Sequence, residues 1–172
     1  ELFRKAGPEV VSSGDLITRF YSRWTPEQLA SHRRAAETLA GVARDAFTYL
    51  ATEIEAGRPV TEGGLRAWVI DAMKKRGCGA GADSHIANGI NAADPHYNPY
   101  GEGATFRRGD VVLLDLWAKE ADDMAYADQT WMGYLGAEVP EKVAEVFGVV
   151  RDARDAAVEF LRRRWAEGTP VQ

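Results

Sequence analysis

The sequence is poor in cysteine and has no long apolar run. Cys78 is its one cysteine among 172 residues, so an internal disulfide and a cysteine-based metal site are both excluded. A lone thiol fits a reducing compartment, and we expect a cytoplasmic protein. No apolar run approaches the roughly 20 residues that a membrane-spanning helix needs. We therefore expect no membrane contact.

Positive charge is also scarce, with a formal net charge of -5. The one basic cluster, residues 162–164, lies near the expected end of a helix, where cations complement the helix dipole. No stripe of lysine and arginine alternates with aromatic residues, so we expect no nucleic-acid partner. What remains is a chain with 45% hydrophobic residues, which is enough for one domain over residues 1–172.

Local start and stop signals predict three main helices, of which the first and the last are long. Thr25 followed by Pro26 and Gln28 is typical of a capping box, and Thr61 is a plausible second cap. The helices are expected between Thr25 and Gly57, between Thr61 and Gly77, and between Val139 and Gly168, with a shorter one near residues 16–21. Two long helices packed on an antiparallel ribbon would give an α+β domain.

That ribbon is predicted by two apolar runs, 109–118 and 124–132, which are rich in strand-forming residues and are typical of a β-hairpin. Each run carries one aspartate, Asp115 in the first and Asp128 in the second. With a four-residue loop over 120–123, the two aspartates lie directly opposite each other on one face. Their Cβ atoms would then be about 4.5–5.5 Å apart.

Two opposed carboxylates repel each other, and desolvation by apolar neighbours such as Leu113, Trp117 and Met132 increases the cost. The first arm is apolar on both faces, which is typical of a buried strand. A shared proton or a bound cation can offset the repulsion, and we interpret the pair as a divalent-metal site. The alternative is a shifted register in which both aspartates are solvated surface residues.

Two segments before the hairpin are less informative. The glycine-rich stretch 77–81 lacks the preceding strand and the following Lys-Ser or Lys-Thr of a phosphate-binding loop, so we interpret it as a flexible connection. Residues 84–92 form a modest strand candidate, and the two prolines of 94–100 exclude a continuous helix there.

The order of these segments resembles the first half of the pita-bread metallopeptidases, the family of Xaa-Pro aminopeptidases, prolidases, methionine aminopeptidases and creatinase. The resemblance runs from about Ser12 to the end of the chain, and the aspartate hairpin is its specific part. The residues that carry it are Thr61-Glu62, Pro95-His96-Tyr97, the run Gly109 to Trp117, and the run Tyr126 to Trp131.

The resemblance implies a pita-bread-like fold and two divalent metal ions, manganese first, with cobalt or zinc as alternatives. Asp115 and Asp128 match two aspartate ligands of the family. His96 matches a histidine beside the scissile bond that helps to stabilise the substrate or its tetrahedral intermediate. Thr130, on the same face as Asp128, is a candidate to support the ligands from behind. Carboxylate oxygens suit such ions, and two metals can activate a bridging water.

The implied activity is hydrolysis of N-terminal peptide bonds in a peptide substrate, by an aminopeptidase or dipeptidase of the Xaa-Pro type. The aspartates are thirteen residues apart, two more than the family usually has, and two extra residues at a hairpin tip preserve the face of each side chain. The family's metal-binding histidine and both glutamates belong to its second half, which we expect beyond Gln172. His32 and His85 lie outside the matching order. We therefore expect an incomplete catalytic domain that is inactive alone, and that forms a homo-oligomer or needs a missing C-terminal half.

Two alternatives remain. A pita-bread scaffold can also serve as a non-catalytic peptide- or protein-binding module, although such a module has no physical reason to keep a repulsive aspartate pair. An independent metal hydrolase built on His96 and the aspartates would need a further ligand from Asp122 or Asp123, which more simply solvate the turn.

Overall fold

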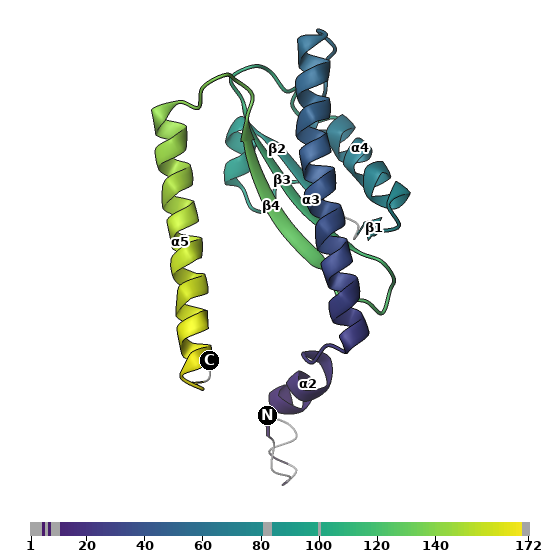
Figure 1. The fold of residues 1–172 in the computed structure, drawn as a ribbon, viewed down its shortest axis with the longest axis vertical. Coiled ribbons are helices and arrows are strands. Elements are labelled where there is room, and N and C mark those ends of the chain that lie inside the picture. Colours follow the sequence, from purple (N-terminus) through teal and green to yellow (C-terminus); the bar gives the residue numbers. More distant parts are fainter. Residues whose placement is uncertain (1–4, 6, 8–10, 81–83, 100, 170–172) are drawn as a thin grey trace.

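The computed structural model describes residues 5, 7, 11–80, 84–99 and 101–169. Figure 1 shows a sheet with two helices lying together against it and a third long helix standing apart. The helices are α2 (Gly14–Tyr21), α3 (Pro26–Glu55), α4 (Glu62–Lys75), the 3-10 helix η1 (Gly89–Ala93) and α5 (Glu141–Ala166). The strands are β1 (Gly79–Ala80), β2 (His85–Asn88), β3 (Val111–Lys119) and β4 (Ala127–Tyr134). No helix in these ranges is long and apolar enough to cross a membrane.

Both predicted helix caps are confirmed. The Thr25 hydroxyl accepts a hydrogen bond from Gln28 N at 3.1 Å, and the Gln28 side chain accepts one from Thr25 N at 2.9 Å. Thr61 Oγ1 accepts from Gly64 N at 3.0 Å. These contacts satisfy N–H groups that have no partner within the first helical turn. Local chemistry therefore sets the starts of α3 and α4.

The sheet is antiparallel throughout, and β3 is its central strand, with β4 along one edge and β2 and β1 along the other. The strand expected over 84–92 is shorter than predicted and gives way to η1 at Gly89. The flexible connection expected over 77–81 is wrong for Gly79 and Ala80, which pair with the end of β3. Residues 81–83 lie outside the described part.

The core lies between one face of the sheet and the helices α3 and α4. Alternate residues of β3 are completely buried there, and the residues between them are half-buried on the opposite face. The prediction that β3 is buried on both faces is therefore wrong, because α3 and α4 cover only one of them. The main buried side chains are Leu39, Leu50, Leu65, Val69, Met73, Ile86, Val112, Leu114 and Leu116.

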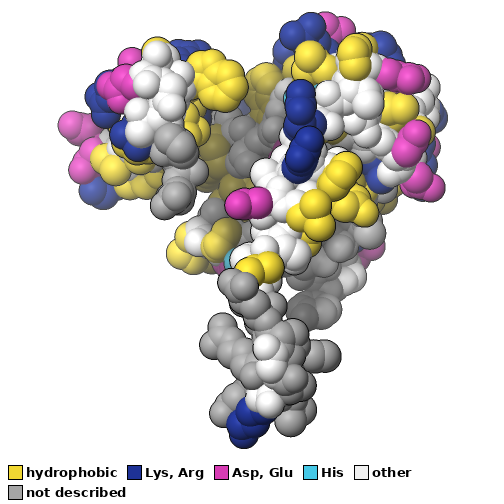
Figure 2. Space-filling view, turned by 90° about the horizontal axis from the view of Figure 1, so that it is seen from below, with side chains coloured by type: hydrophobic (Ala, Val, Ile, Leu, Met, Phe, Trp, Pro, Cys, Tyr) yellow, Lys and Arg dark blue, Asp and Glu magenta, His cyan; other side chains and the backbone are white. Residues whose placement is uncertain are grey.

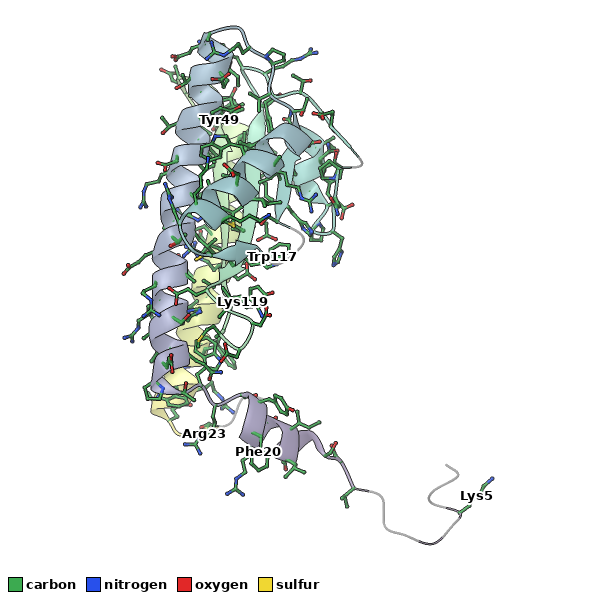
Figure 3. The ribbon with its side chains drawn as sticks, turned by 90° about the vertical axis from the view of Figure 1, so that its right-hand side faces the viewer. Lys5, Phe20, Arg23, Tyr49, Trp117 and Lys119 are labelled. Atoms are coloured by element: carbon green, nitrogen blue, oxygen red, sulfur yellow. The ribbon has the colours of Figure 1, made fainter. Side chains whose placement is uncertain are left out.

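Aromatic stacking joins the two helices that cover the sheet. Tyr49 of α3, labelled in Figure 3, stacks on Trp68 of α4 with ring centroids 5.0 Å apart and an interplanar angle of 9°. Figure 3 also shows α2 extending away from the other elements, and none of its residues is buried. The helices α3 and α4 thus pack together and cover one face of the sheet.

The helix α5 begins at Glu141 as predicted, but the expected packing of its apolar stripe is wrong. None of its residues is buried within the described part of the chain, and Phe160 and Trp165 are 44% and 86% exposed. Figure 2 shows it from its end, separate from the rest, with hydrophobic side chains visible on both parts. An apolar stripe predicts burial only where a partner surface lies within reach, and the two helices that pack on the sheet are α3 and α4.

Candidate metal site

The two aspartates lie on one face of the sheet, but not directly opposite each other. The structure pairs Asp115 with Thr130 and Asp128 with Trp117, so the predicted direct pairing and the four-residue loop over 120–123 are both wrong. The observed register differs from the predicted one by two residues. A shift of two preserves the face of every side chain, and the aspartates are therefore diagonal neighbours on one face.

The helix α3 explains why the connection is longer than predicted. Its side chains hold the residues between β3 and β4, and the paired hydrogen bonds from Arg34 are strong enough to lower the pKa of Glu120 to about 2. These contacts from α3 hold the longer connection in place and support the observed register. The contacts are Arg34 Nε to Glu120 Oε1 at 2.8 Å, Arg34 Nη2 to Glu120 Oε2 at 2.6 Å, Gln28 Nε2 to Asp123 O at 3.0 Å, and His32 Nδ1 to Tyr126 O at 2.8 Å.

The observed register also gives Asp115 a hydrogen-bond donor in place of a like charge. Thr130 Oγ1 donates to Asp115 Oδ1 at 2.7 Å. Thr130 is the residue that the sequence predicts as a candidate to support the ligands. On the other side, His85 pairs with Asp115 across β2, and its Nδ1 lies 4.0 Å from Asp115 Oδ2. The His85 ring meets Trp117 edge-on at 5.2 Å. Asp115 is thus flanked by polar groups on both neighbouring strands.

Sequence reasoning missed this position of His85, because the residue precedes the hairpin and lies outside the family's order. The pairing of β2 with β3 brings it directly opposite Asp115. A strand of four residues carries no signal that fixes its partner or its register. The alternation along 84–92 could have placed His85 on a face, but not beside Asp115.

The pair is less buried than expected, since α3 and α4 cover the opposite face. The Asp115 side chain is 28% exposed, and Asp128 is exposed. Although much of Asp128 is open to solvent, desolvation by the surrounding protein, followed by the negative charge of Asp115, raises the pKa of Asp128 above its usual value. Each effect disfavours the charged form of Asp128. A cation shared by the two carboxylates would instead favour the charged form.

We expect Asp128→Asn to stabilise the metal-free chain at pH 7 by about 0.5 kcal/mol, the scale of a like-charge pair on neighbouring strands. A carboxyl whose pKa is raised by folding adds stability below its unfolded pKa, and that stability is lost as the pH rises through the folded value. Urea unfolding in EDTA should therefore show a difference at pH 7 that shrinks towards pH 4. A variant less stable than the wild type at pH 7 would contradict this reading of the pair.

The structure places His96 in an exposed turn after η1. Its backbone N–H donates to Asp94 Oδ1 at 2.9 Å, and η1 itself packs on β2 and β3. Among the residues described, no ion pair joins His96 to Asp115 or Asp128. The segment that carries His96 is therefore anchored to the sheet, while its side chain faces solvent.

The described residues supply only part of a ligand set. No group of three or more histidine, cysteine, aspartate or glutamate side chains in this part of the chain is arranged to hold a metal ion. At the hairpin tip, Asp122 forms an ion pair with Lys119 at 3.9 Å, which favours its role in solvating the turn. The two aspartates offer hard oxygen donors that fit a divalent cation, and an ion held there would need further donors to complete its coordination.

The chain is similar to known metallopeptidases in sequence and in fold. Curated proteins gave no match, whereas the family profile described as "Metallopeptidase family M24" matches residues 31–170. The X-Pro aminopeptidase from Thermotoga maritima is 25% identical with a TM-score of 0.66, over 92% of this chain and 44% of that one.

Two further solved structures resemble this chain in fold. The prolidase from Pyrococcus furiosus is 26% identical with a TM-score of 0.53, over 70% of this chain and 35% of that one. An X-prolyl aminopeptidase from Caenorhabditis elegans, described as a cytosolic enzyme with a di-nuclear active site, is 22% identical with a TM-score of 0.56, over 69% and 19%. The chain thus spans less than half the length of these proteins. The α+β, pita-bread-like partial fold predicted from the sequence is confirmed.

Proposed function

Because the chain belongs to metallopeptidase family M24, we propose that it is the aspartate-bearing part of an aminopeptidase or dipeptidase of the Xaa-Pro type. The substrate is a peptide, and the bond hydrolysed is the N-terminal one. One observation carries the proposal: Asp115 and Asp128 share a face of the sheet, and the pKa of Asp128 is raised by desolvation and by Asp115. Two divalent ions are the cofactor that this pair suits best.

In this proposal, the site residues of the chain have different roles. Asp115 and Asp128 would hold the ions, and the Thr130 hydroxyl orients Asp115 by donating to its Oδ1. His96 would contact the substrate from its exposed turn. When bound, the ions would supply Lewis-acid activation of a water and of the peptide carbonyl. Carboxylate donors suit manganese, and cobalt or zinc are the alternatives.

The same face of the sheet carries apolar surface that is open to solvent. Leu113 and Trp117 are half-buried there, and Met132 is 39% exposed. Apolar surface of this kind is typical of an interface. We infer that a second copy of the chain, or a C-terminal half that also carries the remaining ligands, covers this face in the working enzyme, which we place in the cytoplasm.

Metal titration of the 172-residue chain tests the proposal. At a free Mn²⁺ concentration ten times the dissociation constant, a single site should stabilise the fold by about 1.4 kcal/mol, as measured by thermal unfolding against an EDTA control. Absence of stabilisation by Mn²⁺, Co²⁺ and Zn²⁺ would contradict the proposal and favour the non-catalytic binding module.

We also expect no measurable hydrolysis of a proline-containing dipeptide by this chain alone, with Mn²⁺ present. Two carboxylates leave the ions without the further donors that a catalytic site needs. An assay of released proline checks this, with a complete aminopeptidase as the positive control. Turnover by the chain would show that its own residues form a complete site.

A further inference from the structure

Glu62 is a completely buried glutamate at the start of α4. No basic side chain pairs with it among the ion pairs of the described residues. Its carboxylate instead accepts four hydrogen bonds, two at each oxygen. Oε1 accepts from Asn88 N at 2.7 Å and Asn91 Nδ2 at 3.0 Å, and Oε2 accepts from Tyr97 Oη at 2.7 Å and Ala104 N at 2.7 Å.

All four donors belong to the segment 88–104, which contains η1 and His96. A carboxylate taken out of water needs such donors, and hydrogen bonds to a charged acceptor are stronger than those between neutral groups. Tyr97 keeps its proton for this purpose, since burial and the contact with Glu62 raise its pKa to about 12. One buried side chain thus holds both ends and the middle of the segment.

The backbone beside Glu62 is fitted to the same segment. Glu62 N donates to Ala104 O at 2.9 Å, and Gly63 N donates to Glu102 O at 2.8 Å. A Cβ atom at Gly63 would collide with the Gly101 carbonyl, and one at Gly103 would collide with the Glu62 carboxylate. The segment therefore approaches the start of α4 more closely than a side chain at either glycine would allow.

We propose that Glu62 is a positioning residue, which fixes the path of residues 88–99 and 101–104 and, through the Tyr97 hydroxyl, the place of the adjacent His96. The segment starts at Asn88, whose partner on β3 is Val112, so the same strand that carries Asp115 also anchors the segment that carries His96. That His96 acts on a substrate rests on the proposed function. That Glu62 holds the segment does not.

The first test compares Glu62→Gln with Glu37→Gln, a matched change at an exposed residue of α3. The new amide group faces two hydrogen-bond donors where a carboxylate oxygen accepted from both. We expect amide hydrogen exchange at Asn88 and Ala104 to accelerate by about tenfold, the signature of local opening, while Leu114 in β3 keeps its rate. Equal acceleration at Leu114, or no acceleration beyond that of Glu37→Gln, would overturn the proposal.

The second test follows His96 itself by the NMR resonances of its imidazole ring. Glu62→Gln and Tyr97→Phe should both shift these resonances, and Glu37→Gln should leave them in place. Tyr97→Phe removes a single donor, so it decides the question should Glu62→Gln fail to fold. Unshifted His96 resonances in the folded variants would overturn the positioning role.

Neither readout requires a metal ion or turnover, so this inference and the proposed function fail separately. A chain that Mn²⁺ does not stabilise would contradict the proposed function and leave the exchange result intact. Unchanged exchange and unshifted His96 resonances would contradict the role of Glu62 and leave metal binding by the aspartates intact.

Discussion

Asp115→Asn should remove most of the stabilisation that Mn²⁺ gives to the chain and should weaken the apparent affinity by about tenfold or more. Asp115 lies on the central strand, where Thr130 donates to its Oδ1 at 2.7 Å. An asparagine can still accept that bond, so the metal-free variant should keep the wild-type fold, with the same small gain in stability at pH 7 that removal of the like charge gives Asp128→Asn. What it loses is the negative charge that attracts a cation. Thermal unfolding in EDTA and in a series of Mn²⁺ concentrations measures both effects.

The matched control is Asp71→Asn, at an exposed aspartate of α4 that pairs with Lys75 at 2.6 Å. This change also removes one negative charge, and it should leave the stabilisation by Mn²⁺ unchanged. Equal losses in the two variants would indicate diffuse attraction of Mn²⁺ to an acidic protein. Undiminished affinity in Asp115→Asn would exclude Asp115 as a ligand.

The largest expected effect on stability is that of Leu114→Ala, which should lower the free energy of unfolding by about 3 kcal/mol. Leu114 is completely buried on the central strand, with Ile86 as its partner on β2 and Trp131 as its partner on β4. Its removal would leave a cavity under α3 and α4 that closely packed neighbours cannot fill. Urea denaturation measures the loss as a lower midpoint at an unchanged slope.

Leu113→Ala is the control for this prediction, since Leu113 is the next residue and points to the other face. Its side chain is half-buried, so the loss should be about 1 kcal/mol, the value of a partly buried apolar side chain. Equal losses at the two positions would mean that the face carrying the aspartates is as well covered in solution as the core face.

Features encoded by neighbouring residues were predictable from the sequence. The capping box of Thr25 and Gln28 and the cap at Thr61 form within one helical turn, so the chain needs no distant contact to specify them. The sequence also predicts that Asp115 and Asp128 lie on the same face of the sheet. Side chains alternate between the two faces along a strand, so an error of two residues in the register leaves each side chain on its face. The α+β class followed from these elements.

Features that depend on distant residues were not predictable. The register of β3 with β4 is supported by contacts from α3, such as Arg34 with Glu120. The place of His85 depends on the pairing of a short strand. In the sequence, Glu62 is an acidic residue in the first turn of a helix, where it suits the helix dipole. Only the fold shows that its carboxylate accepts four hydrogen bonds from the segment 88–104. The exposure of α5 depends in the same way on surfaces that the local pattern does not describe.

The most direct test of the central claim is anomalous X-ray scattering from crystals of the chain grown with Mn²⁺. We predict an anomalous peak on the exposed face of the sheet, within about 2.0–2.6 Å of carboxylate oxygens from both Asp115 and Asp128, as expected for oxygen ligands of a divalent ion. Peaks found only at other carboxylates, with both aspartates free of metal, would contradict the account.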